Sequence, residues 1–206
     1  MPDSLSKSRL LFQDSIKVKQ AILSGDQLQQ LPLMGELIIE RIKNGGKVMF
    51  CGNGGSAADA QHLAAELLVR LRPHVNRQGV AALALSMDSS TLTACGNDFS
   101  FEAFYERMVE TLGTSNDVLL GITTSGKSPN IVRALKVARK MGICTLGFLG
   151  DSGLPAIDHC DLSFLVPSNS TGRIQESHIT AGHILLELVE DGLINCGYIT
   201  LGEQKS

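Results

Sequence analysis

The chain has 206 residues and a formal net charge of −3; 43% of its residues are hydrophobic and 19% are charged. These values are typical of one globular domain with a substantial core, and the small charge gives no global attraction to nucleic acid or to an anionic membrane. No apolar stretch reaches the roughly 18 to 20 residues of a membrane span, and the amino-terminal residues lack a signal pattern. We therefore expect a cytoplasmic protein without nucleic-acid or membrane partners, in which five widely spaced cysteines are reduced core residues.

The first 45 residues show helical periodicity in two segments, and the second segment ends at Gly45 and Gly46. Short apolar runs then alternate with helical stretches. We expect strands at 47–51, 80–85, 117–122, 144–149 and 162–166, with helices at 57–71, 101–112, 129–141 and 174–195. Because the strand candidates are apolar throughout, they are typical of strands buried on both faces. Their alternation with helices predicts an α/β fold with a mainly parallel sheet between two helical layers.

A glycine-rich turn at 52–55 follows the first of these apolar runs, and Ser56 opens an Ala-rich helical segment. The first N–H groups of a helix are unpaired and the helix dipole is positive there, so this order of strand, turn and helix is suited to holding an anion. His62 and Glu66 follow at i and i+4 and share one face of that helix. An anion site beside a histidine and a carboxylate indicates chemistry on a phosphorylated substrate, although such a pair alone is often a solvated surface pair.

A second loop of the same kind follows the run at 117–122 and reads Thr123-Thr124-Ser125-Gly126-Lys127-Ser128-Pro129-Asn130. Its hydroxyls gather at a helix start, where Ser128 is the predicted N-cap and Pro129 the first helical residue. The spacing of 121–128 also matches the nucleotide-binding pattern G-x-x-x-x-G-K-[ST], but no strand ending in a magnesium-binding Asp stands out downstream. A nucleotide triphosphatase and a capped turn without a ligand are therefore less favoured alternatives for this loop.

The last helix carries Gln175 and His183, which are eight residues apart and project from similar sides. His183 lies in an otherwise apolar stretch, so a core histidine with one hydrogen bond is the alternative to a functional group. We expect His178 to face solvent, and we assign no role to His74 or His159.

The two loops resemble those of the SIS (sugar isomerase) domain family, and the whole chain is most similar to the bacterial sedoheptulose-7-phosphate isomerases, or phosphoheptose isomerases, within that family. The matching stretches are 46–66, 95–99, 117–122 and 173–176, together with His183. The resemblance implies a three-layer α/β/α sandwich with a mainly parallel five-stranded sheet at 46–201, preceded at 1–45 by extra N-terminal helices that pack on the domain and on neighbouring subunits. A loose tail is expected at 202–206. The resemblance also implies a homotetramer with active sites at subunit contacts and one zinc ion per subunit.

The activity implied by the resemblance is an aldose–ketose isomerisation of sedoheptulose 7-phosphate to D-glycero-D-manno-heptose 7-phosphate through an enediol, as the first step of ADP-heptose synthesis for lipopolysaccharide. Glu66 and His183 match the acid/base pair of the family, and a carboxylate and an imidazole can supply the base and acid that this reaction needs. The positions that match the zinc-binding set are His62, Glu66, Gln175 and His183. The positions that match the sugar phosphate site are Asn53, Gly54, Gly55, Ser56, Arg70, Asn97, Asp98, Thr123, Thr124, Ser125, Ser128 and Gln175.

Two other functions stay open at this point. Some SIS relatives are non-catalytic binding proteins, including one that associates with the bacterial replication initiator, but these lack the Glu and His that stand here at 66 and 183. An isomerase or sensor for another sugar phosphate is the second alternative, because the loops recognise phosphate and say little about sugar length. The role of zinc is also open between polarising the substrate and stabilising or regulating the protein, since Glu66 and His183 would serve both as ligands and as base and acid.

Overall fold

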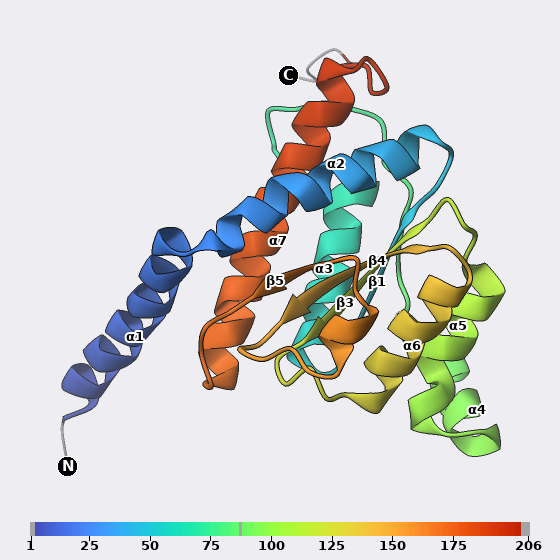
Figure 1. Cartoon of the computed structure of the whole chain (residues 1–206). Coiled ribbons are helices and arrows are strands. Elements are labelled where there is room, and N and C mark those ends of the chain that lie inside the picture. Colours follow the sequence, from blue (N-terminus) through green and yellow to red (C-terminus); the bar gives the residue numbers. More distant parts are fainter. Residues whose placement is uncertain (1–2, 87, 203–206) are drawn as a thin grey trace.

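Five parallel strands form one sheet in the order β2-β1-β3-β4-β5 (Figure 1). The computed structural model describes residues 3–86 and 88–202. The strands are β1 (Val48–Gly52), β2 (Ala82–Ala84), β3 (Val118–Thr123), β4 (Cys144–Leu149) and β5 (Leu162–Leu165). Each lies within two residues of the predicted apolar run, so the predicted parallel sheet is confirmed. Most of the tail expected at 202–206 lies outside the described residues.

Seven α-helices accompany the sheet in the described part of the chain. They are α1 (Ser4–Ser24), α2 (Gln30–Lys43), α3 (Gly55–Leu68), α4 (Ser89–Asp98), α5 (Phe104–Leu112), α6 (Pro129–Lys140) and α7 (Thr171–Asn195), with short 3-10 helices at Asp26–Gln29, Phe101–Ala103 and Ala156–His159. Helix α4 was not predicted; Asp88 caps it by accepting a hydrogen bond from the Ser90 N–H at 2.8 Å. No helix among residues 3–86 and 88–202 is long and apolar enough to cross a membrane.

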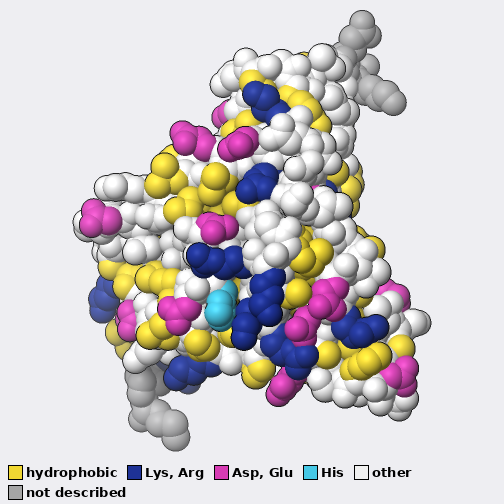
Figure 2. Space-filling model, turned by 45° about the vertical axis from the view of Figure 1, so that its right-hand side comes forward, with side chains coloured by type: hydrophobic (Ala, Val, Ile, Leu, Met, Phe, Trp, Pro, Cys, Tyr) yellow, Lys and Arg dark blue, Asp and Glu magenta, His cyan; other side chains and the backbone are white. Residues whose placement is uncertain are grey.

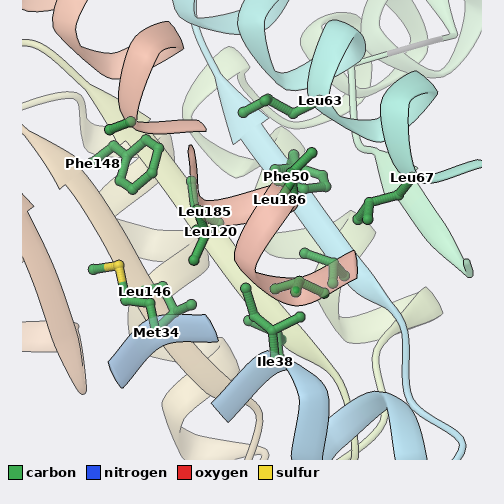
Figure 3. Packing of buried hydrophobic residues seen from close by; sticks show 14 of the residues in the cluster. Met34, Ile38, Phe50, Leu63, Leu67, Leu120, Leu146, Phe148, Leu185 and Leu186 are labelled. Carbon is green, nitrogen blue, oxygen red and sulfur yellow. The ribbon is translucent and has the colours of Figure 1, made fainter. Parts of the chain in front are cut away.

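The helices cover the two faces of the sheet. Side chains alternate along β1, so Val48 and Phe50 pack in one core with α2, α3 and α7, while Met49 and Cys51 pack in a second core with α5 and α6. Figure 3 shows the first core, where Phe50 and Leu120 of the sheet lie among leucines of α3 and α7. The three-layer α/β/α sandwich is therefore confirmed. Helices bury both faces of the sheet, which explains why its strands are apolar throughout.

Helix α1 extends away from the rest of the molecule (Figure 1). It contacts the start of α7, where Arg173 Nη1 donates to the Leu11 carbonyl at 2.6 Å and Ser15 Oγ donates to Glu176 Oε2 at 2.6 Å. Its outer surface carries exposed hydrophobic side chains that include Phe12, which is 76% exposed. Most of the apolar residues that predicted this helix therefore face outward, whereas Val18 and Ile22 near its end pack against the chain's own core.

On the face shown in Figure 2, Lys and Arg side chains lie among Asp and Glu side chains, with hydrophobic side chains scattered between them. Arg133 on α6 pairs with Glu106 on α5. All five cysteines are free, and Cys51, Cys95 and Cys144 are buried. Cys196 is exposed, so the expectation of a core position was wrong for that residue.

His178 lies in the core and not, as expected, in solvent. Its side chain stacks on Phe148 with ring centroids 5.9 Å apart, and its Nε2 lies 3.1 Å from the Leu149 carbonyl oxygen. Burial lowers the pKa of His178 to about 4, and the hydrogen bond to Leu149 opposes this shift only in part. The imidazole is therefore neutral in the folded protein at neutral pH.

This burial predicts an acid-sensitive fold. Between pH 6.5 and about 4 the unfolded chain binds a proton that folded His178 excludes, so the free energy of unfolding falls as pH falls, by at most about 1.4 kcal/mol per pH unit. His178→Gln keeps a donor for the Leu149 carbonyl but cannot titrate. Urea unfolding at pH 7 and pH 5 should show a loss on acidification that is smaller in this variant by about 2 kcal/mol. Equal losses in both proteins would contradict the assignment.

Candidate active site

The two predicted anion loops lie side by side at the carboxyl ends of β1 and β3. These adjacent parallel strands are in register from Val48 opposite Val118 to Gly52 opposite Ile122. The chain leaves β1 through α3 toward β2 and leaves β3 through α6 toward β4, so the connections diverge on opposite faces of the sheet. Such a switch point is where open α/β sheets bind their ligands.

Two asparagines link these loops directly. The Asn53 amide donates to Asn130 Oδ1 at 2.8 Å, and the Asn130 amide donates to Asn53 Oδ1 at 2.8 Å. Asn130 is buried at the start of α6. Asn53 was predicted to line the sugar site, and the structure places its amide in this bridge between the loops.

The second loop brings its hydroxyls together. Thr123 Oγ1 lies 3.1 Å from Ser128 Oγ and 3.5 Å from Ser125 Oγ, and the Lys127 N–H donates to Ser125 Oγ at 3.1 Å. Thr124 lies between them in the chain and is partly buried. These groups precede α6, whose predicted N-cap Ser128 and first-turn Pro129 are confirmed.

Neither helix start is covered by its N-cap side chain. The N-cap of α3 is Gly54, which has no side chain, and Ser128 makes no side-chain hydrogen bond to the first turn of α6. Ser56 in the first turn of α3 is 3% exposed. Two helix N-termini and a group of hydroxyls therefore converge on one edge of the sheet, which suits a phosphate.

His62 and Glu66 on α3 meet His183 on α7. One ligand atom of each lies within 4.8 Å of the others. His62 Nε2 is 2.8 Å from His183 Nε2 and 3.4 Å from Glu66 Oε1, and the imidazole rings are edge-to-face with centroids 5.0 Å apart. Two imidazole nitrogens and a carboxylate oxygen converging in this way could hold a divalent metal ion, and they also offer an acid and a base.

Close packing of α3 and α7 makes this meeting possible. Gly182 stands directly before His183, and a Cβ placed there would lie 2.7 Å and 2.9 Å from the two Cδ atoms of Leu63. Leu63 stands directly after His62 and is 1% exposed. A larger residue at 182 would therefore press the two helices apart beside the histidines.

Asp59 lies close enough to this group to feel the charges of His62 and His183, and it was not predicted as a site residue. It lies one turn before His62 on α3, so Asp59, His62 and Glu66 follow at i, i+3 and i+7 on one face. Its Oδ2 is buried without a hydrogen-bond partner among the described residues. Burial raises the pKa of the Asp59 carboxyl, while the charges of His62 and His183 oppose that rise. The helical spacing alone could have revealed this residue.

Gln175, the fourth predicted zinc ligand, lies near the start of α3. A Cβ at Gly55 would come within 2.5 Å of its Nε2, so the amide packs against the first turn of α3. His183 lies eight residues further along α7, a little over two turns. Helix α7 therefore contacts α3 both at its start, where an anion is predicted to bind, and beside His62.

Three other predicted sugar-site residues lie at or just after the C-terminal ends of α3 and α4. Arg70 follows the C-terminal end of α3 and hydrogen-bonds to Asn76 Oδ1 at 3.3 Å and to the Pro73 carbonyl at 3.4 Å. Asn97 and Asp98 end α4, are exposed, and bond to each other at 2.7 Å. Arg70 is 15 residues from Gly55, about 20 Å along the helical direction, so it is remote from the start of α3 in its own chain.

Comparisons with known proteins agree with this geometry. The model of the SIS domain family matches residues 12–150. Phosphoheptose isomerase of Chlorobaculum parvum is 47% identical over 189 residues, which cover 91% of this chain and 89% of that protein. Phosphoheptose isomerase of Paramagnetospirillum magneticum is 55% identical over 152 residues, covering 74% and 78% of the two chains. The solved structure of a phosphoheptose isomerase from Neisseria gonorrhoeae superposes with a TM-score of 0.85 at 35% identity and covers 92% of this chain and all of its own.

The close contact between α3 and α7 predicts that a larger residue at Gly182 lowers both stability and metal affinity. Gly182→Ala inserts a methyl group against Leu63, so the free energy of unfolding should fall by about 1–3 kcal/mol, and affinity for Zn²⁺ in a competition titration should fall by about tenfold or more.

Gly172→Ala is the matched control, because it lies in the same helix and nothing lies within 4 Å of its added Cβ. That variant should keep the Zn²⁺ affinity of the wild type. Wild-type affinity in Gly182→Ala would show that helix spacing does not set the geometry of the three ligands.

Proposed function

Because the chain belongs to the SIS domain family and, within it, to the phosphoheptose isomerases, we propose that it converts sedoheptulose 7-phosphate to D-glycero-D-manno-heptose 7-phosphate. The observation that carries the proposal is the meeting of His62, Glu66 and His183, from two helices, on a domain whose anion loops lie at the sheet's switch point. The chain thus has both an acid/base pair and a place for the phosphate. A non-catalytic binding protein would need only the place for the phosphate.

The reaction moves one proton between neighbouring carbons and one between their oxygens. Glu66 removes the proton from the carbon beside the carbonyl, and His183 moves the proton between the two oxygens, so that an enediol forms and then collapses to the aldose. The Glu66 carboxylate is partly buried beside two imidazoles. That environment lets it act as a base without full exposure to water.

The phosphate lies at the other end of the substrate. Ser56, Thr123, Thr124, Ser125 and Ser128, with the helix N-termini, hold it by hydrogen bonds. His62 is seven residues beyond Gly55 on α3, roughly 10 Å along the helix axis. A seven-carbon chain with a terminal phosphate can cover such a distance, so binding of the phosphate places the reacting carbons beside the group of His62, Glu66 and His183.

Zinc is the proposed metal. His62, Glu66 and His183 would hold it through two nitrogens and one oxygen, a donor set that suits Zn²⁺, and Gln175 is the proposed fourth ligand. When bound, zinc would supply Lewis acidity to the substrate's carbonyl and hydroxyl oxygens. The protein's own groups still bind the phosphate and transfer the protons.

A homotetramer would complete the site, with residues 1–45 packing on the domain at 46–201 and on neighbouring subunits. On α1, Leu5, Phe12, Ile16 and Leu23 follow at i, i+7, i+11 and i+18 and are 60%, 76%, 51% and 71% exposed, so they form one uncovered apolar stripe. A neighbouring subunit that covered this stripe could also bring its own Arg70, Asn97 or Asp98 to the sugar. The protein would act in the cytoplasm at the first step of ADP-heptose synthesis for lipopolysaccharide.

Replacing the acid or the base should abolish turnover and keep binding. In an assay that follows formation of the aldose from sedoheptulose 7-phosphate, Glu66→Gln and His183→Gln should lower kcat by about 10²- to 10⁴-fold. KM should change little because the phosphate loops are intact.

Glu36→Gln is the control, since it removes an exposed carboxylate from α2, away from His62, Glu66 and His183, and should behave as wild type. Near-normal turnover in Glu66→Gln would overturn the assignment of the base. A wild-type protein that binds the sugar phosphate and forms no product, with Zn²⁺ or without it, would favour the binding protein.

The apolar stripe of α1 predicts the oligomeric state. By light scattering the protein should have about four times the 22.0 kDa mass of one chain. Phe12→Asp places a charge in the stripe and should give smaller species with reduced activity, because a buried unpaired charge is costly. Lys17→Glu alters a charge on the same helix away from the stripe and should leave the tetramer intact. A monomeric wild type would contradict the proposal.

A further inference from the structure

Two buried charges, Arg77 and Glu190, connect the end of α3 to α7. The side chain of Arg77 is 0% exposed and that of Glu190 is 1% exposed. Arg77 Nε donates to Glu190 Oε1, and Arg72 Nε donates to Glu190 Oε2 at 2.6 Å. Burying such a pair costs free energy of desolvation, and well-packed apolar side chains often serve stability as well. A contribution to stability therefore does not by itself explain why this ion pair is buried here.

The remaining donors of Arg77 bind the last turn of α3. Its Nη2 donates to the Glu66 carbonyl at 2.9 Å, and its Nη1 donates to the Leu67 carbonyl at 2.9 Å and to the Gln78 carbonyl at 3.0 Å. The last carbonyls of a helix have no partner within the helix, and a cation is favourable beside them. The planar guanidinium thus caps α3 at the residue that carries the proposed base.

Glu190 lies on the same face of α7 as His183. The two are seven residues apart, or close to two turns, so both side chains point toward α3. Arg77 therefore connects the backbone of Glu66 to the helix face that carries His183 through one guanidinium and one carboxylate.

We propose that Arg77 is a positioning residue of the reaction: its bonds to the Glu66 carbonyl and to Glu190 set the placement of the Glu66 carboxylate relative to His183. An apolar replacement could fill the space but could not bind both the carbonyls and the carboxylate. This inference rests on the proposed function, because it assigns a purpose to the meeting of Glu66 and His183.

The test uses Arg77→Lys, which keeps the charge for Glu190 but cannot span the Glu66 carbonyl, the Leu67 carbonyl and Glu190 at once. We expect kcat to fall by about 10- to 100-fold and Zn²⁺ affinity to fall by about tenfold or more, with KM for the sugar phosphate within about threefold of wild type. Glu190→Gln keeps the size and an acceptor oxygen and should show the same pattern with a loss of about tenfold; it carries the test if Arg77→Lys does not fold.

Lys47→Met is the matched control. It breaks a partly buried ion pair, 2.7 Å long, with Asp117, at the amino ends of β1 and β3 and so at the opposite edge of the sheet from the anion loops. It should lower the free energy of unfolding and leave kcat and Zn²⁺ affinity unchanged.

The outcomes separate the two proposals. A wild-type protein that forms no aldose overturns the proposed function. Wild-type isomerisation with unchanged kcat and Zn²⁺ affinity in Arg77→Lys overturns the positioning role alone. The same kcat loss in Lys47→Met as in Arg77→Lys also overturns it, because the effect would then follow general destabilisation.

Discussion

The packing of α3 against α7 is the contact on which the candidate site depends. It brings His62 within 2.8 Å of His183 although the two are 121 residues apart in the chain. The sheet and its other helices supply the core on which both helices rest. Because no local segment can form this contact, the proposed acid/base pair and any metal site exist only in the completed fold. Leu63 against Gly182 sets how near the helices come.

One helix serves both ends of the proposed substrate. Helix α3 begins at the anion loop and carries His62 and Glu66 two to three turns later. A straight helix has a fixed rise per residue, so the distance between phosphate and reacting carbons is built into α3 and does not depend on a flexible segment. The fixed length of α3 would then select substrates by the length of their carbon chain. Selection of the sugar would depend on backbone geometry more than on side-chain contacts.

Local sequence patterns predicted most strands and helices and part of the candidate site. The features that were not predicted depend mainly on contacts between distant segments. The strands were predictable because both sheet faces are dry, and the His62–Glu66 face followed from helical spacing. Helix α4 was missed because its sequence, which has two Ser, two Thr and one Gly among ten residues, has low helix propensity and depends on the Asp88 cap. The burial of His178 and the bonds of Arg77 were not predictable, since each depends on elements far away in the sequence. The placement of Arg70 came from resemblance and not from any local signal.

The reciprocal amide pair of Asn53 and Asn130 has a consequence for how tightly a ligand can be held. Each amide satisfies the other, and Asn130 Oδ1 also accepts a hydrogen bond from the Ile131 N–H at 3.0 Å. The two loops are therefore fixed relative to each other before any phosphate arrives. The conformational entropy of the loops is therefore lost on folding and not on binding. Modest hydrogen bonds from such preorganised loops can give useful affinity.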